Sequence, residues 1–114
     1  MLTALTRLDL SGNSKLAGGW QHLQPLTRLQ HLDLSHCNLT AIPLQVSALT
    51  DLTRLALSCN ELDYPQTGWQ HLQPLMRLQD LYLEAVLLSE EQVSLALAFL
   101  PQLHMQLHFA EWWA

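Results

Sequence analysis

The chain contains 114 residues, of which 49% are hydrophobic and 13% are charged, and its formal net charge is −5. This is a single-domain length, and the composition is too apolar for a disordered segment. The acidic balance lacks the basic surface with which proteins neutralise nucleic-acid phosphates, so we do not expect nucleic acid as a partner. Because the chain has neither a leader-like start nor a run of 18 apolar residues, we expect a cytoplasmic protein without membrane contacts.

Leucine occupies 29 positions, and its spacing follows one repeated phrase. The phrase has leucine at its first, fourth and sixth residues, and it covers Leu5–Asn13, Leu29–Cys37, Leu52–Asn60 and Leu78–Val86. The fourth-position leucine recurs at intervals of 24, 23 and 26 residues, and a further 26 residues lead to Leu107 in a degenerate fifth copy. Such periods are typical of solenoids. We therefore expect repeats over approximately 2–25, 26–48, 49–74 and 75–99, with a degenerate terminal repeat over 100–114.

Each phrase predicts one short strand, because alternate side chains of a strand point to opposite faces. In the first copy, Leu8 and Leu10 would point inwards while Arg7 and Asp9 point outwards. One repeat cannot bury its leucines alone, but parallel strands stacked about 4.8 Å apart can do so.

The ninth residue of each phrase lies where the chain turns after the strand. An amide side chain both donates and accepts hydrogen bonds, so it can satisfy backbone groups inside the coil. We expect Asn13, Cys37 and Asn60 to form such a structural ladder, with cysteine as a partial substitute. Valine has no polar group, so local irregularity is expected at Val86.

The segments between the phrases carry apolar residues at intervals of three and four, which predicts short helical turns on the outer side. They include Trp20 and Trp69, which occupy the same place in an eight-residue sequence that occurs twice, as Gly19–Leu26 and Gly68–Leu75. This equivalence favours packing between coils over ligand binding for both tryptophans. The clearest helix is expected to begin with the capping box Ser89–Gln92.

The phrases resemble leucine-rich repeats, and Leu39–Pro43 is similar to the continuation found in typical and plant-type members. The resemblance covers nearly the whole chain. It implies an α/β solenoid of about four to five repeats: a curved right-handed coil with a parallel β-sheet on its concave face and short helices or turns on its convex face. Family members commonly hold proteins or peptides on the concave sheet. No cysteine-rich cap is present, so the C-terminal edge with Trp112 and Trp113 is expected to fold back or to make end-to-end contacts.

The outward strand positions form three rows across the predicted sheet. The first row contains Arg7, His31, Arg54, Asp80 and Gln106. The second contains Asp9, Asp33, Ala56, Tyr82 and His108, and the third contains Ser11, Ser35, Ser58, Glu84 and Ala110. Interface hot spots favour arginine and tyrosine. The candidate partner contacts are Arg7, Asp9, His31, Asp33, Arg54, Asp80, Tyr82 and Glu84. The alternative is that the arginines Arg7 and Arg54 only pair with Asp9 and Asp33 at the surface, which contributes little energy.

Other kinds of chemistry find little support in the sequence. His31, Asp33 and His36 lie close together, but His36 is at odd spacing from the other two and no fourth ligand is evident, so we expect no metal and no cofactor. Cys37 and Cys59 are one position out of register, and we expect no disulfide between them. No phosphate loop, nucleophile elbow or Cys/His motif points to an enzyme.

The sequence therefore predicts a non-enzymatic module that binds a protein or peptide on its concave face. A structural alternative stays open: a spacer segment of a longer solenoid, in a receptor or a cytoskeletal scaffold, whose binding site lies elsewhere. A third class, small-ligand or metal binding through His31 and Asp33, would raise the melting temperature when the ligand is added, and we expect no such rise.

Overall fold

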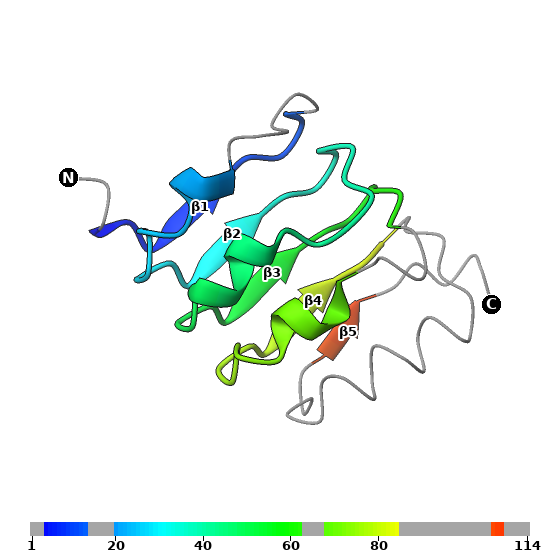
Figure 1. The fold of residues 1–114 in the computed structure, drawn as a ribbon. Coiled ribbons are helices and arrows are strands. Elements are labelled where there is room, and N and C mark those ends of the chain that lie inside the picture. Colours follow the sequence, from blue (N-terminus) through cyan, green and yellow to red (C-terminus); the bar gives the residue numbers. More distant parts are fainter. Residues whose placement is uncertain (1–3, 14–19, 63–67, 85–105, 109–114) are drawn as a thin grey trace.

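The computed structural model describes residues 4–13, 20–62, 68–84 and 106–108. Each repeat contributes one three-residue strand: β1 (Arg7–Asp9), β2 (His31–Asp33), β3 (Arg54–Ala56), β4 (Asp80–Tyr82) and β5 (Gln106–His108). Among the described residues these strands form one sheet in the order β1-β2-β3-β4-β5, and each neighbouring pair is parallel. Figure 1 shows the strands side by side in sequence order, which is the arrangement of a coil that advances by one strand per turn. The predicted parallel-stranded solenoid is confirmed.

The register aligns the fourth-position leucines of the repeats. The central residues that pair across the sheet are Leu8, Leu32, Leu55, Leu81 and Leu107. Leu55 and Leu81 are fully buried and Leu32 is 2% exposed, whereas Leu8 is only half-buried. Each fully buried leucine contributes about 1.5 to 3 kcal/mol relative to exposure, so the stack of leucines is a main source of stability.

The return segments form short 3₁₀ helices: η2 (Trp20–His22), η3 (Leu44–Ala48) and η4 (Trp69–Leu72). Around η3, Val46 donates its N–H to the carbonyl of Pro43, Leu49 donates to Val46, and Leu52 donates to Leu49, at 3.0 to 3.1 Å. A 3₁₀ turn brings every third side chain onto one side. Val46, Leu49 and Leu52 are accordingly all fully buried.

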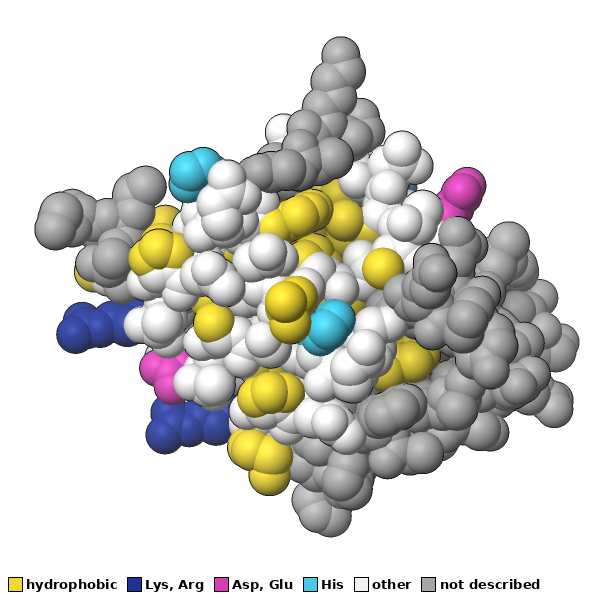
Figure 2. All heavy atoms as spheres, in the orientation of Figure 1, with side chains coloured by type: hydrophobic (Ala, Val, Ile, Leu, Met, Phe, Trp, Pro, Cys, Tyr) yellow, Lys and Arg dark blue, Asp and Glu magenta, His cyan; other side chains and the backbone are white. Residues whose placement is uncertain are grey.

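The helical turns lie together on one side of the sheet (Figure 1). Figure 2, drawn in the same orientation, shows the hydrophobic side chains of this face as separate small groups among polar and backbone atoms. The exposed large hydrophobic residues of the described chain are Leu44 and Met76, which lie 32 residues apart. This face therefore offers no broad apolar surface among the described residues.

The turns after β1, β2 and β3 take a left-handed backbone conformation at one equivalent position. Gly12 has a φ of 79°, His36 of 55° and Cys59 of 58°. Each of the three residues also donates its N–H to a carbonyl of the following repeat, at 2.9 to 3.0 Å. Glycine adopts this conformation without strain, but histidine and cysteine do so against a preference of about 1 to 2 kcal/mol. The hydrogen bonds between repeats thus dictate the conformation even where the residue type opposes it.

Asn60 fills the turn with a complete set of hydrogen bonds. Its Oδ1 accepts from the backbone N–H groups of Cys37 and Leu39 at 3.0 and 2.9 Å, and its Nδ2 donates to the carbonyls of Leu34 and Leu57 at 2.9 Å each. Because the side chain is 3% exposed, these bonds replace water for four backbone groups from two repeats.

The other two residues of the expected ladder make fewer bonds. Cys37 donates its thiol to the carbonyl of Leu10 in the preceding repeat, at 3.1 Å. Asn60 makes the equivalent bond one repeat later, from its Nδ2 to the carbonyl of Leu34. Asn13 donates to the carbonyl of Leu10 at 2.8 Å but is exposed. The thiol therefore reproduces the donor half of the asparagine.

Several expectations concern residues outside the described part of the chain. These are the irregularity at Val86, the helix beginning at Ser89–Gln92 and the C-terminal edge with Trp112 and Trp113. Trp69, by contrast, is described and is 3% exposed, and Trp20 packs against the buried core. The contact of both tryptophans with the core agrees with the packing role predicted from the duplicated sequence.

Candidate functional site

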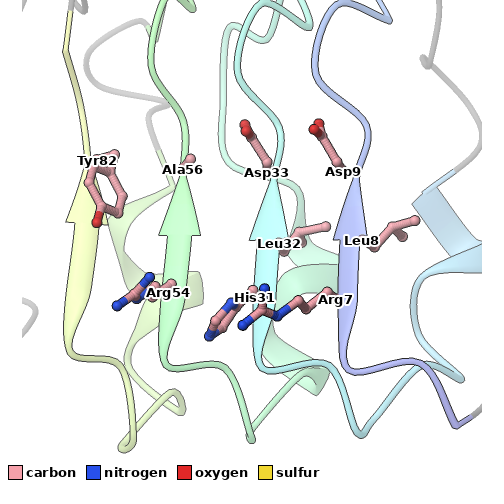
Figure 3. Close-up of a pocket in the computed structure, with 9 residues that line it drawn as sticks. All are labelled: Arg7, Leu8, Asp9, His31, Leu32, Asp33, Arg54, Ala56 and Tyr82. Atoms are coloured by element: carbon pink, nitrogen blue, oxygen red, sulfur yellow. The ribbon is translucent and has the colours of Figure 1, made fainter.

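A hollow of about 500 Å³ lies on the concave face, over the first four strands. Its lining comes from the first two rows and two central leucines: Arg7, Leu8, Asp9, His31, Leu32, Asp33, Arg54, Ala56 and Tyr82. Figure 3 shows these side chains standing on adjacent strands, with the three basic residues near the start of their strands and the two aspartates near the end. Residues from four different repeats therefore meet at one site.

The first row follows from the strand register. Arg7 pairs with His31, His31 with Arg54, and Arg54 with Asp80 as Cα neighbours. The Nε atom of Arg54 lies 3.5 Å from Oδ2 of Asp80, and the two side chains are 56% and 19% exposed. This ion pair orients the guanidinium while more than half of its side chain stays accessible.

His31 lies between Arg7 and Arg54, and these three residues of the first row are called the basic row below. Partial burial lowers the pKa of its imidazole, and the positive charges of Arg7 on β1 and Arg54 on β3 lower it further. Desolvation and like charge both disfavour the protonated ring. Arg7 and Arg54 therefore place two positive charges beside His31, and that of Arg54 is paired on its other side with Asp80.

The second row carries two aspartates whose side chains also accept hydrogen bonds from the backbone just after the strands. The Oδ1 atoms of Asp9 and Asp33 accept the N–H groups of Ser11 and Ser35, each two residues further on, at 2.9 Å. Asp9 additionally accepts the hydroxyl of Ser11, and the two bonds together lower the pKa of its carboxyl group. Such local bonds hold a carboxylate in one orientation.

The pairing of charges differs from the surface pairing considered from the sequence. Among the described residues, Arg54 pairs with Asp80 in its own row, and neither Arg7 nor Arg54 forms an ion pair with Asp9 or Asp33. Neighbours within a row are about 4.8 Å apart, whereas the two rows are separated by two residues of strand, about 6.6 Å. The shorter distance favours a partner in the same row, so the alternative of cross-row pairing by Arg7 and Arg54 does not hold.

The third row is mostly part of the turns. Ser35 is 9% exposed, and the hydroxyl of Ser58 accepts the N–H of Glu84 at 3.1 Å. Glu84 is exposed, and neither Glu84 nor Asp80 lines the hollow. Of the eight candidate contacts, the structure therefore brings six into the hollow. Gln106 and His108 continue the first two rows in backbone register, and Ala110 lies outside the described residues.

Ala56 is a lining residue that the candidate contacts did not include. It stands between Asp33 and Tyr82 in the second row, and its methyl group leaves the floor of the hollow open there. The sequence could have indicated this position, because alignment of the repeats places a small side chain between two larger ones in the second row.

In the described part of the chain, no group of three His, Cys, Asp or Glu residues could hold a metal ion. Cys37 and Cys59 are both free thiols, and burial raises the pKa of Cys37, which keeps it protonated. His36 and Cys59 both serve the left-handed turns described above. The described helices include none long and apolar enough to cross a membrane.

Comparisons with known proteins agree with this architecture. Residues 27–66 match a family model described as leucine-rich repeats in two copies. A leucine-rich-repeat protein of Leptospira interrogans is 28% identical with a TM-score of 0.65, over 78% of this chain and 21% of its own. Internalin C2 of Listeria monocytogenes is 20% identical with a TM-score of 0.57, over 96% of this chain and 53% of its own. No curated protein sequence matches the chain. The chain thus spans about a fifth of the first structure and about half of the second.

Proposed function

Because the chain carries leucine-rich repeats and folds as their solenoid, we propose that it is a non-enzymatic interaction module whose concave face binds a segment of another protein. The proposed contacts are Arg7, Asp9, His31, Asp33, Arg54, Asp80, Tyr82 and Glu84. Protein binding is the general role of this fold, and the concave location and the individual contacts are our inference for this chain.

The observation that carries the proposal is the hollow itself. It combines arginine, histidine, aspartate and tyrosine side chains on one parallel sheet, and its lining spans four repeats. Arginine and tyrosine dominate the energetics of protein interfaces because each provides a large contact area with directional polar groups. On the opposite, helical face, Figure 2 shows a short row of basic and acidic side chains at one edge.

The test begins with partner identification by proximity labelling, followed by direct binding measurements with the purified partner. The double variant Arg54→Ala/Tyr82→Ala removes two proposed anchors, and we expect its affinity to fall at least tenfold. The matched control is Arg77→Ala, which removes an arginine that is 72% exposed and paired with Asp51 away from the hollow. Circular dichroism and the melting temperature establish that each variant is folded. Unchanged binding by a folded double variant would show that the concave face is not the binding surface.

A second candidate function is that of a spacer within a longer array. The observation that favours it is the similarity to only 21% of the longer Leptospira structure. A solenoid segment of this kind contributes reach and stiffness, and its ends contact neighbouring repeats. Coding sequence that continues the leucine phrases on both sides, together with a partner that binds only the flanking repeats, would favour the spacer.

A further inference from the structure

The charges that line the hollow are segregated by position along the strands. Figure 3 shows Arg7, His31 and Arg54 near the start of β1, β2 and β3, and Asp9 and Asp33 near the end of β1 and β2. A ligand that lies along β1 and β2 therefore meets a positive potential at one end of the hollow and a negative potential at the other, while on the side of β4 the charge of Arg54 is paired with Asp80. Such an arrangement selects a partner whose charges are separated in the same way.

The separation of the two rows matches the repeat of an extended peptide. The rows are two residues apart on each strand, which is about 6.6 Å. An extended segment likewise presents its residues i and i+2 on the same side at about this distance. A segment that lies parallel or antiparallel to β3 can thus place one side chain over each row.

Ala56 provides the space for one of these side chains. It is flanked by Asp33 on β2 and Tyr82 on β4, which are two strand spacings, or about 9.6 Å, apart. The carboxylate of Asp33 is already oriented by the N–H of Ser35. A cation placed over Ala56 would have a carboxylate on one side and the ring of Tyr82 on the other, and both attract positive charge.

We propose that the hollow binds an extended segment of a partner protein that carries a basic and an acidic side chain two positions apart. The lysine or arginine sits over Ala56 between Asp33 and Tyr82, and the aspartate or glutamate sits over His31 and Arg54. This inference rests on the proposed function, because it assumes that the concave face is the binding surface. It adds the chemistry of the segment that this surface takes.

The state of His31 supports the acidic position. Partial burial lowers its pKa, the charges of Arg7 and Arg54 lower it further, and Asp9 and Asp33 lie two residues along the strands on the other side of the hollow. A carboxylate bound in the basic row would offset the two arginines and favour the protonated ring. We therefore expect the pKa of His31 to rise when the correct segment binds, which gives a signal at the site itself.

The first experiment compares short peptides on the intact chain by NMR at low ionic strength. Each peptide has the same glycine-serine flanks, and the central sequences are Lys-Thr-Glu, Glu-Thr-Lys, Lys-Thr-Thr-Glu and Gln-Thr-Gln. Both orders with one intervening residue are expected to bind, since an extended segment can lie in either direction. We expect them to bind at least fivefold more tightly than the peptide with two intervening residues or the neutral peptide, and to raise the pKa of His31. Fivefold corresponds to one exposed ion pair of about 1 kcal/mol.

The second experiment changes the protein. Asp33→Asn keeps an oxygen for the N–H of Ser35 but removes the charge, and we expect it to weaken the Lys-Thr-Glu peptide about fivefold. Ala56→Leu fills the space over Ala56 and is expected to abolish the preference for the correct spacing. Ala48→Leu, on the helical side in η3, is the matched control and should leave peptide binding unchanged.

The outcomes separate this inference from the proposed function. Equal binding of all four peptides, or an unchanged His31 pKa when they bind, would overturn the inference. A purified partner could bind Arg54→Ala/Tyr82→Ala more weakly but bind Asp33→Asn and Ala56→Leu normally. In that case the concave face is the binding surface, but the partner segment does not carry the proposed basic and acidic side chains. If the double variant binds that partner normally, the proposed function itself fails.

Discussion

Replacement of Asn60 by alanine tests how much one buried amide contributes to the coil. Four hydrogen bonds of 2.9 to 3.0 Å connect Asn60 to backbone groups on both sides of a repeat boundary. Alanine removes all four and leaves two N–H donors and two carbonyls without the partner they had. At about 1 kcal/mol for each lost bond, Asn60→Ala should reduce the free energy of unfolding by about 4 kcal/mol.

The assay is equilibrium unfolding in urea, with the melting temperature as a second measure. For a domain of this size, about 4 kcal/mol corresponds to a decrease of about 15 °C in the melting temperature. The control is Asn13→Ala, because Asn13 has the same place in its repeat but is exposed and makes one short bond, to the carbonyl of Leu10 at 2.8 Å. We expect that variant to lose less than about 1 kcal/mol.

A third variant divides the contribution of Asn60 into its two halves. Asn60→Cys introduces the residue that the preceding repeat has at Cys37, whose thiol donates to a carbonyl across the boundary. It should retain part of the donor half and lose the two bonds accepted by Oδ1, which predicts a loss of about 2 to 3 kcal/mol. Equal losses for Asn60→Ala and Asn13→Ala would refute the argument from burial.

Three further predictions concern the core, a turn and the basic row. Leu55→Ala, at a fully buried position, should lower the free energy of unfolding by about 2 to 5 kcal/mol in urea, and a loss below 1 kcal/mol would mean that the stack collapses to fill the cavity. Gly68→Ala should destabilise more than Gly12→Ala: both glycines have positive φ, but only at Gly68 would a Cβ atom meet other atoms at 3.0 Å. Arg7→Ala should raise the pKa of His31 towards 6.5, as followed by NMR, because one of its two neighbouring positive charges is removed. Because the pKa of His31 is lower in the folded state than in the unfolded state, stability decreases as the pH falls below about 6.5. Arg7→Ala should weaken that decrease. An identical His31 pKa in the variant and the original protein would contradict the assignment.

The sheet could be predicted from the sequence because the spacing of one residue type, leucine, marks each repeat. Alignment of the leucine phrases fixed which residues would be neighbours, and the strand register pairs Leu8, Leu32, Leu55 and Leu81 in that order. The first two surface rows follow directly, because side chains alternate along a strand. Sequence alone did not distinguish 3₁₀ from α turns on the return side, since spacings of three and four fit both.

The details of the turns could not be predicted from residue preference. Gly12 suits a left-handed conformation, but His36 and Cys59 adopt it as well because their N–H groups bond to the next repeat. The ion pair of Arg54 with Asp80 was missed for a related reason. The left-handed turns and the ion pair both depend on distances between atoms of neighbouring repeats, and these distances cannot be obtained from the order of residues within one repeat.

Ala56 shows how a departure from the repeat can be interpreted as function. In the first two repeats, an aspartate at this position accepts the N–H of a serine two residues further on, so the acid helps to end the strand. The third repeat keeps the serine, Ser58, but has alanine in place of the acid, and the hydroxyl of Ser58 accepts the N–H of Glu84 instead. Alanine is a poor strand residue and has no such bond to offer, so the fold gives no local reason for it.

This reasoning leads to the variant Ala56→Asp, which restores the residue of the first two repeats. Its carboxylate can accept the N–H of Ser58 as Asp9 and Asp33 accept theirs, so we expect the free energy of unfolding to stay within about 0.5 kcal/mol of the original or to increase. The same side chain occupies the open floor of the hollow, so a partner segment that needs this space should bind at least fivefold more weakly, a change that calorimetric titration measures. If the alanine serves only packing, Ala56→Asp will lower stability and leave the affinity unchanged. A loss of affinity without a loss of stability means that Ala56 is there for the ligand.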